Sequence, residues 1–279
     1  MQHAADLFAD ATSSGPRIRV GIGGWNFAPW RNNFYPAGLV QRRELEYASR
    51  QLRAIEINGT YYGAQKPATY ASWASQTPED FVFSLKAPRY VCETKKLAEA
   101  GKGVLGFIQG GLEEFGPKLG PILWQLSPWR VFDAGDLAGF LESLPRELAG
   151  WPLRHVLEVR HGSFLCEDYV ALARQHAIPT VFTDSDKYPS LADLTGDFVY
   201  ARLMRSAADI DTGYAAQALD TWASRAKQWR DGSDIAELPH VATQQPSGAR
   251  RDAFIFFISS AKERNPAAAM ALQARVDAG

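Results

Sequence analysis

Short apolar segments that end in ionisable side chains constrain the fold of this chain more than any other feature. The clearest example is the stretch Leu153 to Phe164, LRHVLEVRHGSF. Side chains alternate along a strand, so Leu157 is expected on one face and Glu158 and Arg160 on the other. His161 follows directly. This pattern is compatible with a buried Glu158–Arg160 pair that only fills the core, or with a ligand site at the end of a strand.

Similar short apolar segments recur along the chain, and segments with helical spacing separate them. The other expected strands are Ile18–Gly24, Ala54–Asn58, Phe81–Ala87, Pro121–Leu126, Pro179–Asp184, Phe198–Leu203 and Ala253–Ile258. The expected helices are Gln41–Leu52, Pro67–Gln76, Val104–Phe115, Asp136–Leu148, Glu167–His176, Ala216–Arg230 and Pro266–Val276. This alternation predicts the α/β class and a single TIM-type (β/α)8 barrel. An open doubly wound sheet is the alternative, although no GxGxxG motif follows the first strand.

Length and composition fit one soluble domain. We expect a flexible N-terminal arm at residues 1–16 and one barrel over residues 17–279, close to the usual barrel size of about 250 residues. A formal charge of −1 gives no electrostatic reason to expect strong binding to nucleic acid. No secretory signal and no apolar run of membrane-spanning length is evident. Cys92 and Cys166 lack CxxC spacing, which favours a reducing, cytoplasmic location.

Polar residues at the strand ends are expected to share one site, because the carboxyl ends of parallel strands form the ligand face of a barrel. The candidates for catalysis are Glu56, Lys86, Glu158, His161 and Asp184. The candidates for ligand binding are Trp25, Asn58, Tyr61, Tyr62, Gln125, Arg160 and Arg202. Burying so many ionisable groups costs several kcal/mol per ion unless they are paired or serve a ligand. A shared site is therefore favoured over salt bridges that merely close the barrel top.

Several acid–base assignments are open at this stage. Neighbouring carboxylates and cations shift each other's pKa, so Glu56, Glu158 or Asp184 is expected to act as a base and Lys86 or His161 as an acid. We expect no metal and no other cofactor. Carboxylates would suit Mg²⁺ or Mn²⁺, but the cations expected in the same place already neutralise them.

At these residues the chain resembles the YecE-like family, also called domain of unknown function 72, from about Arg19 to Gly232. The segments that carry the resemblance are VGIGGW (Val20–Trp25), FYPAGL (Phe34–Leu39), EINGTYY (Glu56–Tyr62), TPEDFVFSLKAP (Thr77–Pro88), LWQLSP (Leu123–Pro128), EVRHGSF (Glu158–Phe164) and DFVYARL (Asp197–Leu203). The family is similar to TIM barrels, so the resemblance implies that fold. It implies no reaction, because fold alone does not fix function.

Two segments depart from the family pattern. After the Arg-Leu of the seventh strand the family usually has His and Gly, where this chain has Met204 and Arg205. At the end of the eighth strand the family usually has two Asn, where this chain has Ile258 and Ser259. The Gly-His-Ala-Pro stretch that usually follows is replaced by AKERNPAAAMAL. Strands two to six keep the family's residues.

These features predict an enzyme that uses general acid–base chemistry on a small polar or anionic ligand, such as a sugar, a phosphate ester or a nucleotide fragment. One alternative is a phosphodiester-cleaving barrel of the nucleic-acid repair type. Another is a ligand-binding or scaffold protein without turnover, which the departures at Met204, Ile258 and Ser259 favour. We expect neither a membrane nor a nucleic acid as partner.

Overall fold

The computed structural model describes residues 15–244 and 248–278, so most of the expected N-terminal arm lies outside the described residues. Within them, eight parallel strands form one sheet in the order β7-β4-β3-β2-β1-β10-β9-β8. They are β1 (Ile18–Gly23), β2 (Ala54–Ile57), β3 (Val82–Lys86), β4 (Leu119–Gln125), β7 (His155–Glu158), β8 (Phe182–Thr183), β9 (Phe198–Leu203) and β10 (Asp252–Phe257). A bridge between Leu157 and Thr180 joins the two edges of the sheet. The predicted TIM-type barrel is therefore confirmed, and the open sheet is excluded.

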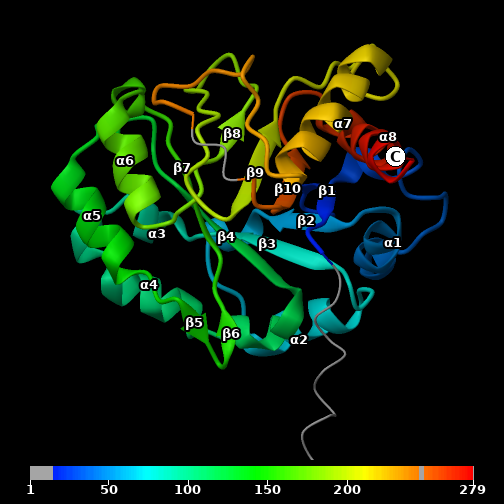
Figure 1. The fold of residues 1–279 in the computed structure, drawn as a ribbon. Helices are drawn as coiled ribbons and strands as arrows, with labels where there is room; N and C mark the ends of the chain where they lie inside the picture. Colours follow the sequence, from blue (N-terminus) through cyan, green and yellow to red (C-terminus); the bar gives the residue numbers. More distant parts are fainter. Residues whose placement is uncertain (1–14, 245–247, 279) are drawn as a thin grey trace, which may run out of the picture.

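Helices surround the strands (Figure 1). They are α1 (Glu44–Gln51), α2 (Pro67–Ser75), α3 (Arg89–Cys92), α4 (Gly101–Ile108), α5 (Ala134–Ser143), α6 (Glu167–Gln175), α7 (Ala216–Arg230) and α8 (Asn265–Asp277). In Figure 1, α4, α5 and α6 lie on one side of the barrel, and α1, α7 and α8 lie on the other. None of the described helices combines the length and apolarity that a membrane crossing requires.

Strand alternation divides the buried side chains into two sets. Ile55, Phe83 and Leu85 belong to the large apolar core that includes the surrounding helices. A second, separate set fills the barrel interior and consists of Ala54, Val82, Leu123, Val156, Val181, Phe198, Tyr200, Met204, Phe254, Phe256 and Ile258. The faces predicted for β7 agree with this division, because Leu157 belongs to the outer core and Val156 to the interior set. Side chains two residues apart on a strand point the same way, so Glu56, Glu158 and Arg202 point into the barrel near its carboxyl end.

The predicted helix Val104–Phe115 is wrong in its extent. The structure has α4 ending at Ile108, followed by a 3₁₀ segment at Leu112–Lys118. Gly111 separates them with a φ of 114°, a conformation that an α-helix cannot contain.

The predicted helix Asp136–Leu148 also ends early. It stops at Ser143, and Glu147–Leu148 (β5) pairs with Trp151–Pro152 (β6) in a small antiparallel hairpin. Gly150, with a φ of 83°, lies in the connecting turn and provides the positive dihedral angle that such short connections need.

The predicted strand Pro179–Asp184 is shorter than expected, because only Phe182–Thr183 pairs with β9. Phe182 packs outward against Trp222 of α7, with ring centres 5.6 Å apart, whereas Val181 belongs to the barrel interior. Asp184 follows in phase with the outward Phe182, so this strand does not place it on the inner face with Glu56 and Glu158.

Gly21 of β1 provides a test of the strand packing. A Cβ at this position would lie 2.1 Å from the Ala54 carbonyl oxygen of β2, so we expect Gly21→Ala to lower the free energy of unfolding by roughly 1–3 kcal/mol. Gly106→Ala is the matched control, because it is in α4 and its Cβ would meet no heavy atom within 4 Å. That variant should gain about 0.5–1 kcal/mol. Equal stability of both variants in urea denaturation would contradict the close approach of β1 and β2.

Candidate functional site

A buried arginine, Arg202 of β9, is the centre of a polar network at the carboxyl end of the barrel. Its Nη2 and Nε donate to Oε1 and Oε2 of Glu56 at 2.9 and 3.1 Å, and its Nη1 donates to Oε2 of Glu158 at 2.5 Å. The three side chains are 2%, 0% and 2% exposed. The planar guanidinium thus binds one carboxylate with two parallel hydrogen bonds and reaches a second on another strand, which matches its fixed donor geometry.

Neutral side chains complete the hydrogen bonding of this Arg202 network. Gln125 accepts from the Nη1 of the central guanidinium at 3.3 Å. Asn58 and Tyr200 donate to the two oxygens of Glu56 at 3.0 and 2.7 Å. The Ser84 hydroxyl lies 2.7 Å from that of Tyr200. Both Glu56 oxygens therefore have two donors each, which compensates for much of the water lost on burial.

Arg160 lies between Glu158 and the solvent at the carboxyl end of the barrel (the barrel mouth). Its Nε donates to Oε1 of Glu158 at 2.7 Å, and its guanidinium lies 4.0 Å from the centre of the Tyr188 ring. Burial alone would raise the pKa of Glu158, but the charges of Arg202 and Arg160 outweigh it and hold that pKa below its ordinary value. Glu158 is consequently ionised at neutral pH and suits electrostatic stabilisation better than proton transfer.

Lys86 contributes a further cation without a matching anion. It ends β3 in phase with Val82 and Ser84, and its Nζ lies 4.0 Å from the centre of the Tyr61 ring. Among the described residues, no carboxylate lies within ion-pair distance of this ammonium. Burial, followed by the charge of Arg202, lowers the pKa of Lys86 to about 8. Lys86, Arg160 and Arg202 together oppose Glu56 and Glu158, and Glu93 at the edge of the mouth is paired with Arg89 at 2.7 Å, so one surplus positive charge is left when Lys86 is protonated.

Like Lys86, the predicted catalytic residues Asp184 and His161 are not bonded to the Arg202 network in the described part of the chain. The Asp184 carboxylate accepts from the Met204 backbone N–H at 2.5 Å and from the Tyr214 hydroxyl at 2.9 Å. Burial raises the pKa of Asp184 despite these hydrogen bonds. His161 has its Nδ1 2.8 Å from the Ser163 hydroxyl and accepts the Ser163 N–H, so it caps the short turn that follows β7. Catalytic roles for both residues stay predictions.

The aromatic residues that we predicted to bind a ligand also fall into two groups. Tyr61 lies in the mouth, under Lys86, and Tyr62 is 86% exposed beside it with ring centres 5.4 Å apart. Trp25 instead packs edge-on against Trp73 of α2 at 4.9 Å, away from the network. Tyr61 and Tyr62 can therefore contact a ligand at the mouth, whereas Trp25 mainly supports the packing of α2.

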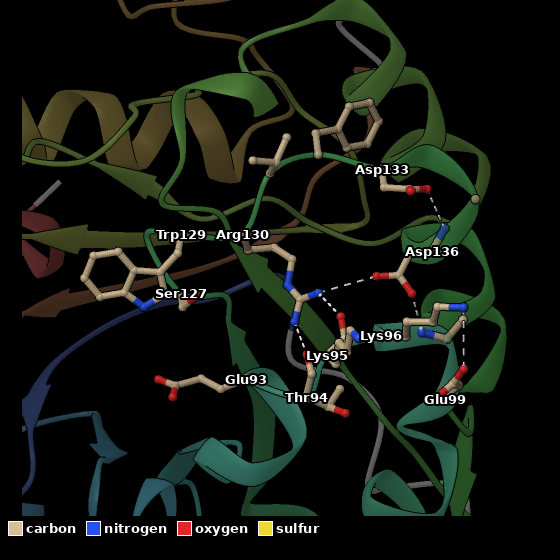
Figure 2. Close-up of a pocket in the computed structure, with 14 residues that line it drawn as sticks. Glu93, Thr94, Lys95, Lys96, Glu99, Ser127, Trp129, Arg130, Asp133 and Asp136 are labelled. Carbon is tan, nitrogen blue, oxygen red and sulfur yellow. Dashed lines mark hydrogen bonds and ion pairs between the residues drawn. The ribbon is translucent and has the colours of Figure 1, made fainter.

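A cavity of ≈ 830 Å³ lies beside the mouth, between the loops that follow α3 and β4 (Figure 2). Figure 2 shows the Arg130 guanidinium at its centre, where it donates to the carbonyls of Thr94 and Lys95 and pairs with Asp136 at 3.5 Å. Trp129 extends from the rim and is 81% exposed. The cavity adjoins the mouth through Glu93, which accepts from the Tyr61 hydroxyl at 2.8 Å.

Four residues of the site were missing from the sequence-based set: Ser84, Glu93, Tyr188 and Tyr200. Tyr200 and Ser84 lie two residues before Arg202 and Lys86 on the same strands, so strand alternation could have identified both. Tyr188 and Glu93 lie in loops, and their contacts with Arg160 and Tyr61 join segments distant in sequence. No periodicity in the sequence indicates such contacts.

The part of the mouth that follows the ends of β9 and β10 is apolar. Met204 and Ile258, which replace polar residues of the family pattern, are both buried in the interior apolar set. In the part of the chain that is described, no group of three or more His, Cys, Asp or Glu side chains is arranged to hold a metal ion. The polar chemistry of the site is therefore concentrated on β2, β3, β4, β7 and β9.

The Arg202 network gives a prediction about stability. Glu158→Gln leaves Arg202 and Arg160 facing an amide, and we expect it to lower the free energy of unfolding at pH 7 by roughly 3–5 kcal/mol. The folded-state pKa of Glu158 is lowered, so its stabilising effect is present above its ordinary pKa and is lost as the pH falls through the lowered one. The difference between parent and variant should accordingly shrink on acidification. Glu46→Gln, which alters the exposed Arg43 pair, is the control and should have little effect, and a pH-independent difference for Glu158→Gln would contradict the assignment.

Comparisons with known proteins agree with this architecture. The structure is similar to DUF72 family proteins from Thermotoga maritima (TM-score 0.70, 22% identity, 93% of this chain and 99% of that chain) and Enterococcus faecalis (TM-score 0.67, 14% identity, 94% and 96%). It is also similar to SacUVDE (TM-score 0.52, 12% identity, 94% and 99%), and at these identities the likeness shows the fold alone. None of the curated proteins matches the sequence. The family model described as "Protein of unknown function DUF72" matches residues 19–279, beyond the Gly232 limit of the segments that we recognised, and the chain therefore belongs to this family, for which YecE-like is another name.

Proposed function

We propose that this protein is an enzyme that binds a small polar molecule with an anionic group at the carboxyl end of the barrel and transforms it by acid–base chemistry. The observation that carries the proposal is Lys86, a half-buried cation without a carboxylate partner among the described residues, beside a fully hydrogen-bonded ionic network. A network needed only to stabilise the barrel would leave no charge uncompensated. The surplus positive charge instead suits an anionic ligand.

In the proposed reaction, different residues of the mouth bind the anion, transfer the proton and hold the polar groups in position. Lys86 and Arg160 attract the anionic group, since both are part-buried cations on the side of the network that faces solvent. Lys86 also transfers a proton, because a pKa of about 8 allows both protonation states near neutral pH. Glu56, Glu158 and Arg202 hold the polar groups in fixed positions, which reduces the reorganisation that a reaction requires.

The alternative functions differ in how their ligands should behave. A phosphodiester-cleaving barrel would bind abasic or single-stranded DNA with an affinity that falls steeply with salt concentration. A small anionic metabolite in a part-buried site should stabilise the protein with a much weaker dependence on salt. A binding or scaffold protein would bind such a ligand without converting it.

A thermal-shift screen tests the proposal directly. Phosphate esters, sugar acids and nucleotide fragments are added to the parent protein. A ligand present at 100 times its Kd should raise the free energy of unfolding by about 2.7 kcal/mol. We expect Lys86→Met to lose this stabilisation. Lys262→Met is the matched control, because Lys262 is also half-buried above an aromatic ring, 4.5 Å from the centre of Phe27, but none of the charges of the Arg202 network affects its pKa. Stabilisation that survives Lys86→Met, or that only DNA provides and salt removes, would contradict the proposal.

A further inference from the structure

The position of Lys86 has a second chemical consequence. An amine acts as a nucleophile only in its neutral form, and proteins favour that form by placing a lysine in a poorly hydrated site or beside another cation. Lys86 meets both conditions, since it is half-buried against the Tyr61 ring, and the charge of Arg202 lowers its pKa more than either Glu56 or Glu158 raises it. Ion pairing with a carboxylate would have the opposite effect. The described residues supply no such partner.

We propose that Lys86 is a nucleophile that forms a Schiff base with an aldehyde or ketone group of an anionic substrate. This inference rests on the proposed function, because it assigns the same mouth a class of substrate and a type of reaction. It depends on three features of the geometry: the inward position of Lys86 at the carboxyl end of β3, the absence of a carboxylate partner in the described chain, and the nearby Arg160 as a binding group for the substrate's anion.

The reaction is balanced with water and a proton from solvent. The neutral Nζ adds to the carbonyl carbon, and a proton passes from the added nitrogen to the carbonyl oxygen to give a carbinolamine. A proton from solvent then lets the hydroxyl group leave as water, and the nitrogen lone pair forms the C=N bond of a protonated iminium. Hydrolysis by one water molecule reverses these steps and restores the free amine. The positively charged imine withdraws electrons from the adjacent carbon, so a C–H or C–C bond there becomes easier to break.

Other lysines of the chain show why Lys86 is distinctive. The Lys118 ammonium donates to the carbonyls of Ala74 and Thr77 at 2.6 and 2.7 Å, which occupies its hydrogens in local structure. Lys262 lies above the Phe27 and Trp30 rings, but neither an arginine nor any other charge contributes to its lowered pKa. Both lysines are also partly buried but lack the neighbouring Arg202, so they are internal controls for chemical reactivity.

Borohydride trapping tests the inference on the full-length protein. The protein is incubated at pH 8 with pyruvate, glyoxylate or dihydroxyacetone phosphate, each with sodium cyanoborohydride, and the modified lysines are identified by peptide mass spectrometry. An ordinary lysine with a pKa near 10.4 is mostly protonated at this pH, so we expect at least about tenfold more label on Lys86 than on any other lysine. Lys118 and Lys262 should be labelled no more than the remaining lysines.

Lys86→Arg is the companion variant, because it keeps the positive charge but lacks a primary amine. We expect it to lose the dominant label and to retain the thermal stabilisation given by anions that have no carbonyl group, such as inorganic phosphate. Labelling spread evenly over the lysines, or absent from Lys86 with all three probes, would overturn the Schiff-base inference. If phosphate still stabilises the parent in that case, the proposed anion-binding function stands. If it does not, both proposals fail.

Discussion

The contact between Arg202 and its two carboxylates is the interaction on which the barrel mouth depends. Removing a guanidinium from water costs several kcal/mol, and only close, well-directed partners offset that cost. Glu56 supplies two parallel hydrogen bonds and Glu158 supplies a third, from strands on different sides of β9 in the barrel. These three charges thereby fix the relative positions of β2, β7 and β9 at their carboxyl ends. Lysine could not replace Arg202, since a single ammonium lacks the planar donor geometry.

The barrel interior has three layers, and only one of them requires a functional explanation. At the amino end, Asp252 pairs with Arg19 at 3.4 Å and Arg154 at 2.6 Å. The middle is filled by apolar side chains, as barrel cores usually are. The carboxyl end contains the Arg202 network and the unmatched Lys86. Apolar residues of similar size would stabilise a barrel at least as well as buried ions, so the polar layer is better explained by a ligand than by folding.

The sequence predicted side-chain directions best on strands where the alternation of inward and outward residues is regular. The period of two on β2, β7 and β9 predicted that Glu56, Glu158 and Arg202 point into the same space, and the structure places them in direct contact. Asp184 was misplaced because its strand has only two paired residues, too few to define a phase. The missing partner of Lys86 could not be predicted either, since it depends on distances between strands that the sequence does not contain. Loop contacts such as Arg160 with Tyr188 escape prediction for the same reason.

The central claim is that the fold holds Lys86 in a part-buried site beside Arg202 without a carboxylate partner. The titration of its side chain measures this directly. The protein is labelled with lysine carrying ¹³C at Cε, the Lys86 signal is assigned as the one lost in Lys86→Met, and its chemical shift is followed from pH 6 to pH 11. We expect a midpoint at about 8, because burial and the Arg202 charge disfavour the ammonium. A midpoint near the ordinary value of about 10.4 would show a hydrated or ion-paired lysine and would contradict the account.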